Sequence, residues 1–191
     1  DIVLNSLTSS YDYSYSNNLL TRLKKNSSII RVIGMGGSIL GTRAIYKFLQ
    51  YKIKKKVYFV DNLKKNLNKD ESKKILNLII SKSGNTLETI TNANLLLKKS
   101  QKNVFITQDN SNYLRNLAQK LKSEIIDHNN YIGGRYSVLS EVGMLPAMLM
   151  GLDVKKFRNL NELIKKQSFR ISLINNVSNI LSLLKKKKSN S

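Results

Sequence analysis

The sequence predicts an α/β fold of the doubly wound type, with a parallel sheet of about five strands and a helical C-terminal extension. Five short β-branched runs indicate the sheet, because each is almost continuously apolar, as strands buried on both faces of a parallel sheet are. Stretches with helical periodicity separate these runs, and such alternation is typical of parallel α/β sheets. The runs are IIRVIG (29–34), KVYFV (56–60), NLIIS (77–81), NVFIT (103–107) and EIID (124–127).

Helices are expected between the strands because apolar residues recur there every three or four positions. The clearest case places Leu114, Leu117, Ala118 and Leu121 on one face. We therefore predict that these helices lie on the faces of the sheet. The predicted helical segments are 42–51, 87–99 and 111–121.

The character of the chain changes after residue 137. Residues 138–152 predict an apolar helix that contains the only proline, Pro146, which should kink the helix or mark its first turn. Asn159 is a candidate N-cap for the segment that follows. Residues 168–184 carry an apolar stripe that requires a partner surface. The expected parts are a partial N-terminal segment (1–27), a binding domain (28–152) and a helical connection (153–191).

The chain does not begin with Met, so we expect it to be a piece of a longer protein. No run reaches the roughly 18 apolar residues that a membrane span requires. The first residues, DIVLNSLTSS, lack the basic and then apolar pattern of a signal peptide. We therefore expect no membrane partner and a cytoplasmic location.

The net charge of +21 suggests nucleic-acid binding, but the composition argues against it. Lys (26), Asn (23) and Ile (19) dominate, as AT-rich codons would produce, whereas Arg (7), the better bidentate phosphate ligand, is the minor base. Zero cysteines exclude disulfides, thiol catalysis and Cys-based metal sites, and one histidine argues against His-rich metal sites. The composition thus argues against a metal site built on Cys or His and against a nucleic-acid partner. A basic nucleic-acid-binding protein is kept only as the least favoured of three functional interpretations.

Three loops follow predicted strands, where parallel α/β folds bind their ligands. The first, the glycine loop, is GMGGSILGTR (34–43). Ile39 replaces the last glycine of a dinucleotide fingerprint, and the lysine of a phosphate-binding P-loop is missing. A tight turn into a helix remains, with the Ser38 hydroxyl exposed, and its glycines allow the backbone to approach a ligand closely. The alternative is a tight βα turn without a ligand.

The second, the phosphate loop, is SKSGNT (81–86). Gly84 allows a sharp turn, Lys82 adds positive charge, and the helix that follows directs unpaired N–H groups at the loop. Hydroxyls and free N–H groups together predict a phosphate cradle that needs no metal. The alternative is a hydroxyl-rich loop that only caps the helix. The hydroxyls belong to Ser81, Ser83 and Thr86.

The third, the arginine loop, is YIGGRYSVLSEVG (131–143). Arg135 follows two glycines, whose backbone freedom could direct the guanidinium inward. An arginine stays charged and can stabilise a developing oxyanion. The alternative is a loop arginine in a surface salt bridge.

The phosphate loop resembles the S-x-S-G-x-T motif of sugar-isomerase (SIS) domains, which have a flavodoxin-like fold. Further motifs make residues 28–152, and more weakly 153–184, similar to the phosphoglucose isomerase family. The chain departs from the family at Glu141, where a small residue is usual, and this difference concerns local helix packing. The further motifs are GMGGSILGTRA, FVDNL (59–63), LETITNA (87–93) and GGRYSVLSEVGMLPA (133–147).

The resemblance implies reversible aldose–ketose isomerisation of glucose 6-phosphate and fructose 6-phosphate through a cis-enediolate, in glycolysis and gluconeogenesis. It implies no cofactor, a sugar phosphate as the small-molecule partner, and a homodimer in the intact protein. By motif match, Arg135 would stabilise the enediolate, and Gly37 and Ser38 would contact the sugar. The phosphate would be held by Ser81, Lys82, Ser83, Gly84, Asn85 and Thr86.

The resemblance also implies what this sequence lacks. In the family, the glutamate that transfers the proton, a ring-opening histidine and a further lysine lie in a second SIS subdomain. Glu141 and Glu162 lack that context, and His128 is expected to be structural. We therefore expect the first SIS subdomain, holding the phosphate-binding half of the site and inactive alone. The alternative is a non-enzymatic SIS-domain sensor of sugar phosphates.

Overall fold

The computed structural model describes residues 2–25, 27–63, 74–158, 163 and 165–185. Contacts between residues divide the chain into two units, Asp1–Val154 and Lys155–Ser191. All the described strands belong to the first unit.

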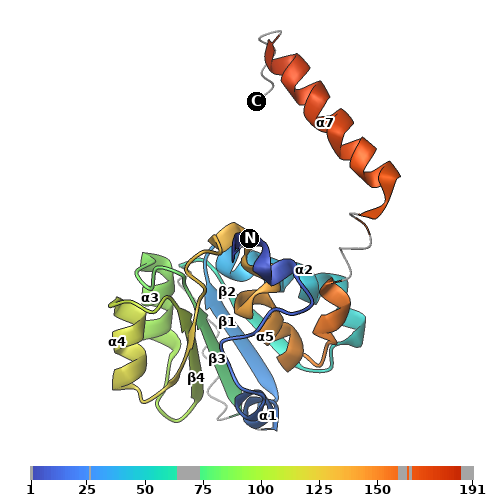
Figure 1. Ribbon diagram of the computed structural model, residues 1–191. Coiled ribbons are helices and arrows are strands. Elements are labelled where there is room, and N and C mark those ends of the chain that lie inside the picture. The colour runs from blue at the N-terminus through green and yellow to red at the C-terminus, as the bar shows by residue number, and fades with distance from the viewer. Residues whose placement is uncertain (1, 26, 64–73, 159–162, 164, 186–191) are drawn as a thin grey trace. The chain divides into compact units, whose positions relative to one another are not determined.

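The first unit is built on a five-stranded parallel sheet, which confirms the predicted fold class (Figure 1). Its strands are β1 (Ile29–Gly34), β2 (Lys56–Val60), β3 (Ile75–Ile80), β4 (Lys102–Thr107) and β5 (Glu124–Asp127). Three of these coincide with predicted runs, whereas β3 begins two residues earlier and β4 one residue earlier than expected. The spatial order is β2-β1-β3-β4-β5, so the direction of winding reverses between β1 and β3. Such a switch point is where open α/β sheets bind ligands.

Helices cover both faces of this sheet. Those of the first unit are α1 (Asn17–Lys25), α2 (Gly37–Phe48), α3 (Leu87–Leu96), α4 (Tyr113–Lys120) and α5 (Glu141–Leu149). Helices α1, α2 and α5 lie on one face, and α3 and α4 lie on the other (Figure 1). Short 3₁₀ turns complete the unit: η1 (Ile2–Leu7), η2 (Gln50–Lys52) and η3 (Gly134–Leu139), with η4 (Val154–Arg158) at the junction with the second unit.

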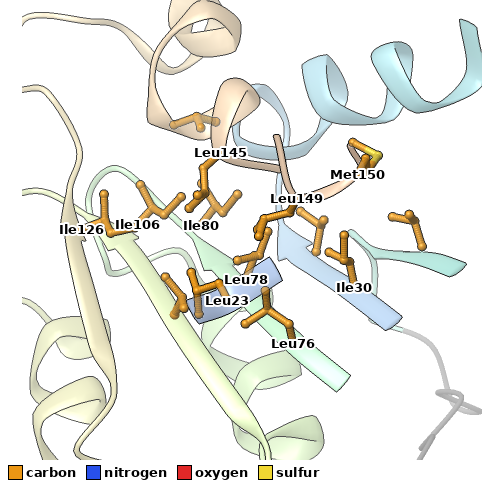
Figure 2. Close-up of a cluster of buried hydrophobic side chains, with 14 of the residues drawn as sticks. Leu23, Ile30, Leu76, Leu78, Ile80, Ile106, Ile126, Leu145, Leu149 and Met150 are labelled. Carbon is orange, nitrogen blue, oxygen red and sulfur yellow. The ribbon is translucent and has the colours of Figure 1, made fainter. Parts of the chain in front are cut away.

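Strand β3 shows why the strand runs are mostly apolar. Its Leu76, Leu78 and Ile80 pack in the cluster that also contains Leu149 of α5 (Figure 2). The intervening Ile79 belongs to a second cluster, with side chains of α3 and α4. Because successive side chains point to opposite faces and both faces are covered, apolar residues suit both sides of the strand. The exception is Asn77, which is fully buried, accepts a hydrogen bond from Arg31, and donates to Gln101 and Asn103.

The helix boundaries differ more from the predicted ranges than the strand boundaries do. Helix α2 begins at Gly37 rather than at residue 42, because the glycine loop itself forms the first turn, in which the Leu40 N–H donates to the Gly36 carbonyl at 3.0 Å. Helix α1 has no counterpart among the predicted segments. Its sequence, NNLLTRLKK, has only three apolar residues, so its pattern is weak.

The apolar segment 138–152 was predicted to be one helix, but it contains the end of η3 followed by α5. Helix α5 starts at Glu141, so Pro146 lies in its interior and not in its first turn. A proline has no N–H and cannot bond to the carbonyl four residues earlier, here Val142. The Thr42 hydroxyl of α2 donates to that carbonyl at 3.2 Å, and this bond ties α2 to α5. The predicted N-cap, Asn159, lies outside the described residues.

The second unit contains helix α7 (Gln167–Lys185), at the position of the predicted apolar stripe. None of its side chains is buried, and its apolar residues other than the partly buried Phe169 are about half exposed or more. That this stripe packs on a partner surface stays a prediction. None of the described helices is both long enough and apolar enough to cross a membrane. The exposed apolar residues of α7 are Ile171, Leu173, Ile174, Val177, Ile180, Leu181, Leu183 and Leu184.

Candidate functional site

A cavity of about 680 Å³ lies at the carboxyl ends of the strands, next to the switch point of the sheet. All three loops singled out in the sequence contribute to its walls. The glycine and phosphate loops meet there because they follow the neighbouring strands β1 and β3 at the same edge of the sheet. The arginine loop follows the edge strand β5 and reaches the cavity because η3 packs against α2. Its lining residues are Met35, Gly36, Gly37, Ser38, Leu40, Gly41, Ser81, Lys82, Ser83, Thr86, Gln108, Gly134, Arg135 and Val138.

The glycine loop brings Gly37 and Ser38 to the cavity wall in the first turn of α2. Gly36, the N-cap, has a φ of +54°, a conformation that favours glycine. A Cβ on Gly37 would lie 2.2 Å from the Gly134 carbonyl oxygen. The close approach that requires glycine at position 37 is therefore made by the backbone of the arginine loop.

The phosphate loop leaves β3 at its carboxyl end and leads into α3. The Ser81 and Thr86 hydroxyls lie 3.0 Å apart, and the Ser83 hydroxyl accepts a hydrogen bond from the Asn85 N–H at 3.3 Å. Thr86 is the N-cap of α3 but makes no side-chain capping bond. The N–H groups of the first turn, with the positive end of the helix dipole, thus lie beside three hydroxyls, an arrangement that suits an anion.

Gly84 and Asn85 are not among the cavity-lining residues. The Asn85 side chain accepts a hydrogen bond from the Tyr113 N–H at 3.0 Å, and the Gly84 carbonyl accepts one from Leu114 N–H at 3.1 Å. Gly84 has a φ of +66°, and a Cβ there would lie 1.9 Å from the Asn112 side-chain oxygen. Both residues therefore hold the start of α4 against the phosphate loop, and their predicted contact with the substrate stays a prediction.

Two cations line the cavity, Lys82 and Arg135. The Lys82 ammonium donates to the Asn130 carbonyl at 2.8 Å, which connects the phosphate loop to the segment leading into the arginine loop. Arg135 is exposed, and within the described parts of the chain it forms no ion pair. The surface salt bridge considered as the alternative is thus not formed with any described residue.

No carboxylate is among the residues that line this cavity in the described part of the chain. Glu141 is buried at the start of α5, where it accepts hydrogen bonds from the Tyr11 hydroxyl and the Ser14 N–H. Glu162 lies outside the described residues. The described residues also contain no group of three or more His, Cys, Asp or Glu that could hold a metal ion. A positive cavity without carboxylates favours a small anion.

His128 is buried and does not line the cavity. Its Nδ1 lies 3.0 Å from the Asn129 carbonyl oxygen, and its Nε2 has no hydrogen-bond partner among the described residues. Burial is the main cause that lowers the pKa of this imidazole below its usual value. A structural role for His128 stays our interpretation.

Gln108 is a lining residue that the sequence analysis missed. It directly follows β4, at the same edge of the sheet as the three predicted loops. The rule that ligands bind at the carboxyl ends of strands, applied to every strand, would have found it. No glycine or hydroxyl cluster lies at this position in the sequence, so Gln108 was not predicted.

Curated proteins of similar sequence are glucose-6-phosphate isomerases. The chain is 39% identical over 137 residues to glucose-6-phosphate isomerase of Methanocaldococcus jannaschii, which covers 65% of this chain and 33% of the relative. It is 35% identical over 156 residues to glucose-6-phosphate isomerase of Acholeplasma laidlawii, with 69% and 36% covered. The chain thus spans about a third of the length of these curated relatives.

Solved structures show the same fold. A hypothetical protein from Thermus thermophilus, TT0462, superposes with a TM-score of 0.69 at 21% identity, covering 92% of this chain and 48% of that one. A glucose-6-phosphate isomerase from Chlamydia trachomatis superposes with a TM-score of 0.60 at 21% identity, covering 82% and 35%. A sequence profile described as phosphoglucose isomerase matches residues 19–191. The chain therefore belongs to the phosphoglucose isomerase family.

Proposed function

We propose that the chain supplies the phosphate-binding half of the active site of a glucose-6-phosphate isomerase. The intact enzyme interconverts glucose 6-phosphate and fructose 6-phosphate. The observation that carries this proposal is a cavity in which three hydroxyls, a helix N-terminus and two cations meet, with no carboxylate among the described residues that line it. A sugar phosphate has the charge that such a cavity favours, and its phosphate suits the hydroxyl-rich loop.

Each loop has one role in this proposal. The phosphate loop holds the phosphate through the hydroxyls of Ser81, Ser83 and Thr86, the N–H groups at the start of α3 and the Lys82 ammonium. Gly84 and Asn85 remain proposed contacts of the same phosphate. Gly37 and Ser38 contact the sugar. Arg135 stabilises the negative charge of the cis-enediolate, since a guanidinium remains charged at every relevant pH.

Proton transfer between adjacent carbons requires a positioned base, usually a carboxylate. Because none lines the cavity in the described part of the chain, the base in this proposal comes from elsewhere in the intact protein. The proposal also includes a homodimer that works in the cytoplasm, in glycolysis and gluconeogenesis, without a nucleic-acid or membrane partner. Residues 28–152 then form the first SIS subdomain, and 153–191 lead to the second.

A non-enzymatic SIS-domain sensor is the second candidate, because a cavity that binds a sugar phosphate without a base suits a sensor equally well. The two candidates differ in what the complete reading frame encodes. Isomerase activity of its full-length product supports the enzyme. Binding of sugar phosphates without turnover by that product supports the sensor.

The experiment on the purified 191-residue chain has two readouts. Calorimetry should detect binding of fructose 6-phosphate, and Ser83→Ala should weaken it about tenfold because a donor to a charged phosphate is lost. Ser100→Ala, at an exposed serine outside the cavity, should bind as the parent chain does. A coupled dehydrogenase assay should detect no glucose 6-phosphate formation. Absence of binding would refute the proposal, and measurable turnover would refute the idea of a half site.

A further inference from the structure

The position of Gln108 is set by its contact with the phosphate loop. It is the first residue after β4, which lies directly beside β3 in the sheet. Its backbone N–H donates to the Lys82 carbonyl at 3.0 Å, and the Thr107 hydroxyl donates to the same carbonyl at 3.3 Å. Gln108 is thus joined to the loop that carries the three hydroxyls.

The backbone of Gln108 is also held from the other side. Its carbonyl accepts hydrogen bonds from the Asn112 side-chain amide at 3.3 Å and from the Arg115 Nε at 3.2 Å. Arg115 is itself paired with Asp127 and Asp109. Contacts on both sides therefore fix the position from which this side chain starts.

The side-chain carboxamide of Gln108, unlike its backbone, is not held by hydrogen bonds to described residues. It lines the cavity, is partly exposed, and makes no hydrogen bond with any described residue. A fixed backbone with an uncommitted amide on a cavity wall is well suited to ligand recognition, because only the side-chain torsions must be ordered on binding.

The order of the sheet indicates which part of a ligand this amide meets. The glycine loop follows β1 and Gln108 follows β4, and the phosphate loop follows β3, which lies between these two strands. Gln108 therefore lies on the opposite side of the phosphate loop from Gly37 and Ser38. A ligand whose sugar extends toward Ser38 and Arg135 places its phosphate, and not its sugar, next to Gln108.

We infer that Gln108 is a further substrate-contacting residue, whose amide N–H₂ donates a hydrogen bond to the phosphate of the bound sugar phosphate. The inference rests on the proposed function and adds one ligand to it. A neutral donor orients the phosphate without adding charge to a cavity that already holds two cations. Because the phosphate accepts the bond, a carboxylate at this position would both remove the donor and repel the ligand.

Two variants test the contact by calorimetry with two probes, fructose 6-phosphate and inorganic phosphate. Gln108→Glu should weaken the binding of both about tenfold or more, and Gln108→Met, which keeps the length but removes the donor, should weaken both about threefold to tenfold. Gln119→Glu is the matched control, since Gln119 is exposed on α4 and does not line the cavity. It should bind both probes within about twofold of the parent chain.

The outcomes separate this inference from the proposed function. If both Gln108 variants bind as the parent chain does while Ser83→Ala binds more weakly, the inference is wrong and the proposed function stands. If Gln108→Glu weakens only fructose 6-phosphate, the amide contacts the sugar and the stated contact is refuted. If the parent chain binds neither probe, the proposed function fails and the inference fails with it.

Discussion

The buried carboxylate of Glu141 offers a sharp test of how the N-terminal segment is held. Glu141 is 2% exposed, and its two oxygens lie 3.0 and 2.9 Å from the Tyr11 hydroxyl, while Oε1 also accepts the Ser14 N–H at 3.0 Å. One hydroxyl proton serves one oxygen at a time, so the two distances to Tyr11 represent one shared hydrogen bond. Tyr11→Phe removes this bond and leaves the Ser14 N–H as the carboxylate's one hydrogen-bond donor among the described residues.

The expected cost follows from these contacts. A hydrogen bond to a charged group contributes about 1.5–3 kcal/mol, and a charge left underpaired in the interior brings the value toward the upper end of that range. We therefore expect Tyr11→Phe to lower the free energy of unfolding by about 2–3 kcal/mol. Against a typical total of roughly 5–15 kcal/mol, such a loss is readily measured.

The assay is urea denaturation followed by circular dichroism. Tyr51→Phe is the control, because Tyr51 is 78% exposed and Phe retains the ring that faces Lys52, so its effect should stay within about 0.5 kcal/mol. In a double-mutant cycle with Glu141→Ala, the Tyr11–Glu141 coupling should be about 1–3 kcal/mol. If Tyr11→Phe is as stable as Tyr51→Phe, the carboxylate does not depend on Tyr11 and the reasoning fails.

Three further predictions concern the site and its support. Gly37→Ala places a Cβ 2.2 Å from the Gly134 carbonyl oxygen, so it should displace the arginine loop and weaken fructose 6-phosphate binding about tenfold or more, measured by calorimetry. Gly134→Ala, whose Cβ meets nothing within 4 Å, should change this binding little. Thr42→Val leaves the buried Val142 carbonyl without its donor and should lower the urea-derived free energy of unfolding by about 1–3 kcal/mol, and an unchanged value would contradict this. Because the pKa of His128 is lowered in the folded chain, the unfolded chain binds more protons than the folded chain just below about pH 6.5. The free energy of unfolding should therefore fall as the pH drops through that value. His128→Leu should reduce this pH-dependent loss of stability, measured as the difference between the urea midpoints at about pH 7.5 and about pH 5.5. An equal difference in the variant and the parent chain would refute the role given to His128.

The strands could be predicted closely because a parallel strand that is buried on both faces is a nearly continuous apolar run in the sequence. The range 29–34 coincides with β1, whose residues from Ile30 to Gly34 are all buried. Helix boundaries are harder to predict, since only one face of such a helix is apolar and the pattern is periodic rather than continuous. The first turn of α2 contains Gly37 and Ser38, so apolar periodicity placed its start at residue 42 instead.

The candidate site could be predicted in outline for a different reason. Loops that follow parallel strands share one edge of the sheet, and β1 and β3 are neighbours, so the glycine and phosphate loops are expected side by side. The arginine loop follows the edge strand β5 and reaches the site because η3 packs against α2. What each residue of a loop does could not be read in this way. Asn85 belongs to the phosphate loop, yet its side chain bonds to the start of α4, because the chain turns sharply at Gly84.

By itself, the sequence determined the fold class, the edge of the sheet at which the candidate site lies, and the family, because these depend on local patterns of apolar, glycine and hydroxyl residues. Only the tertiary structure decided which side chains meet across long stretches of chain. Tyr11 is 130 positions from Glu141, and Thr42 is 100 positions from Val142. Hydrogen bonds between such distant residues depend on the path of the whole chain, and no local pattern records them.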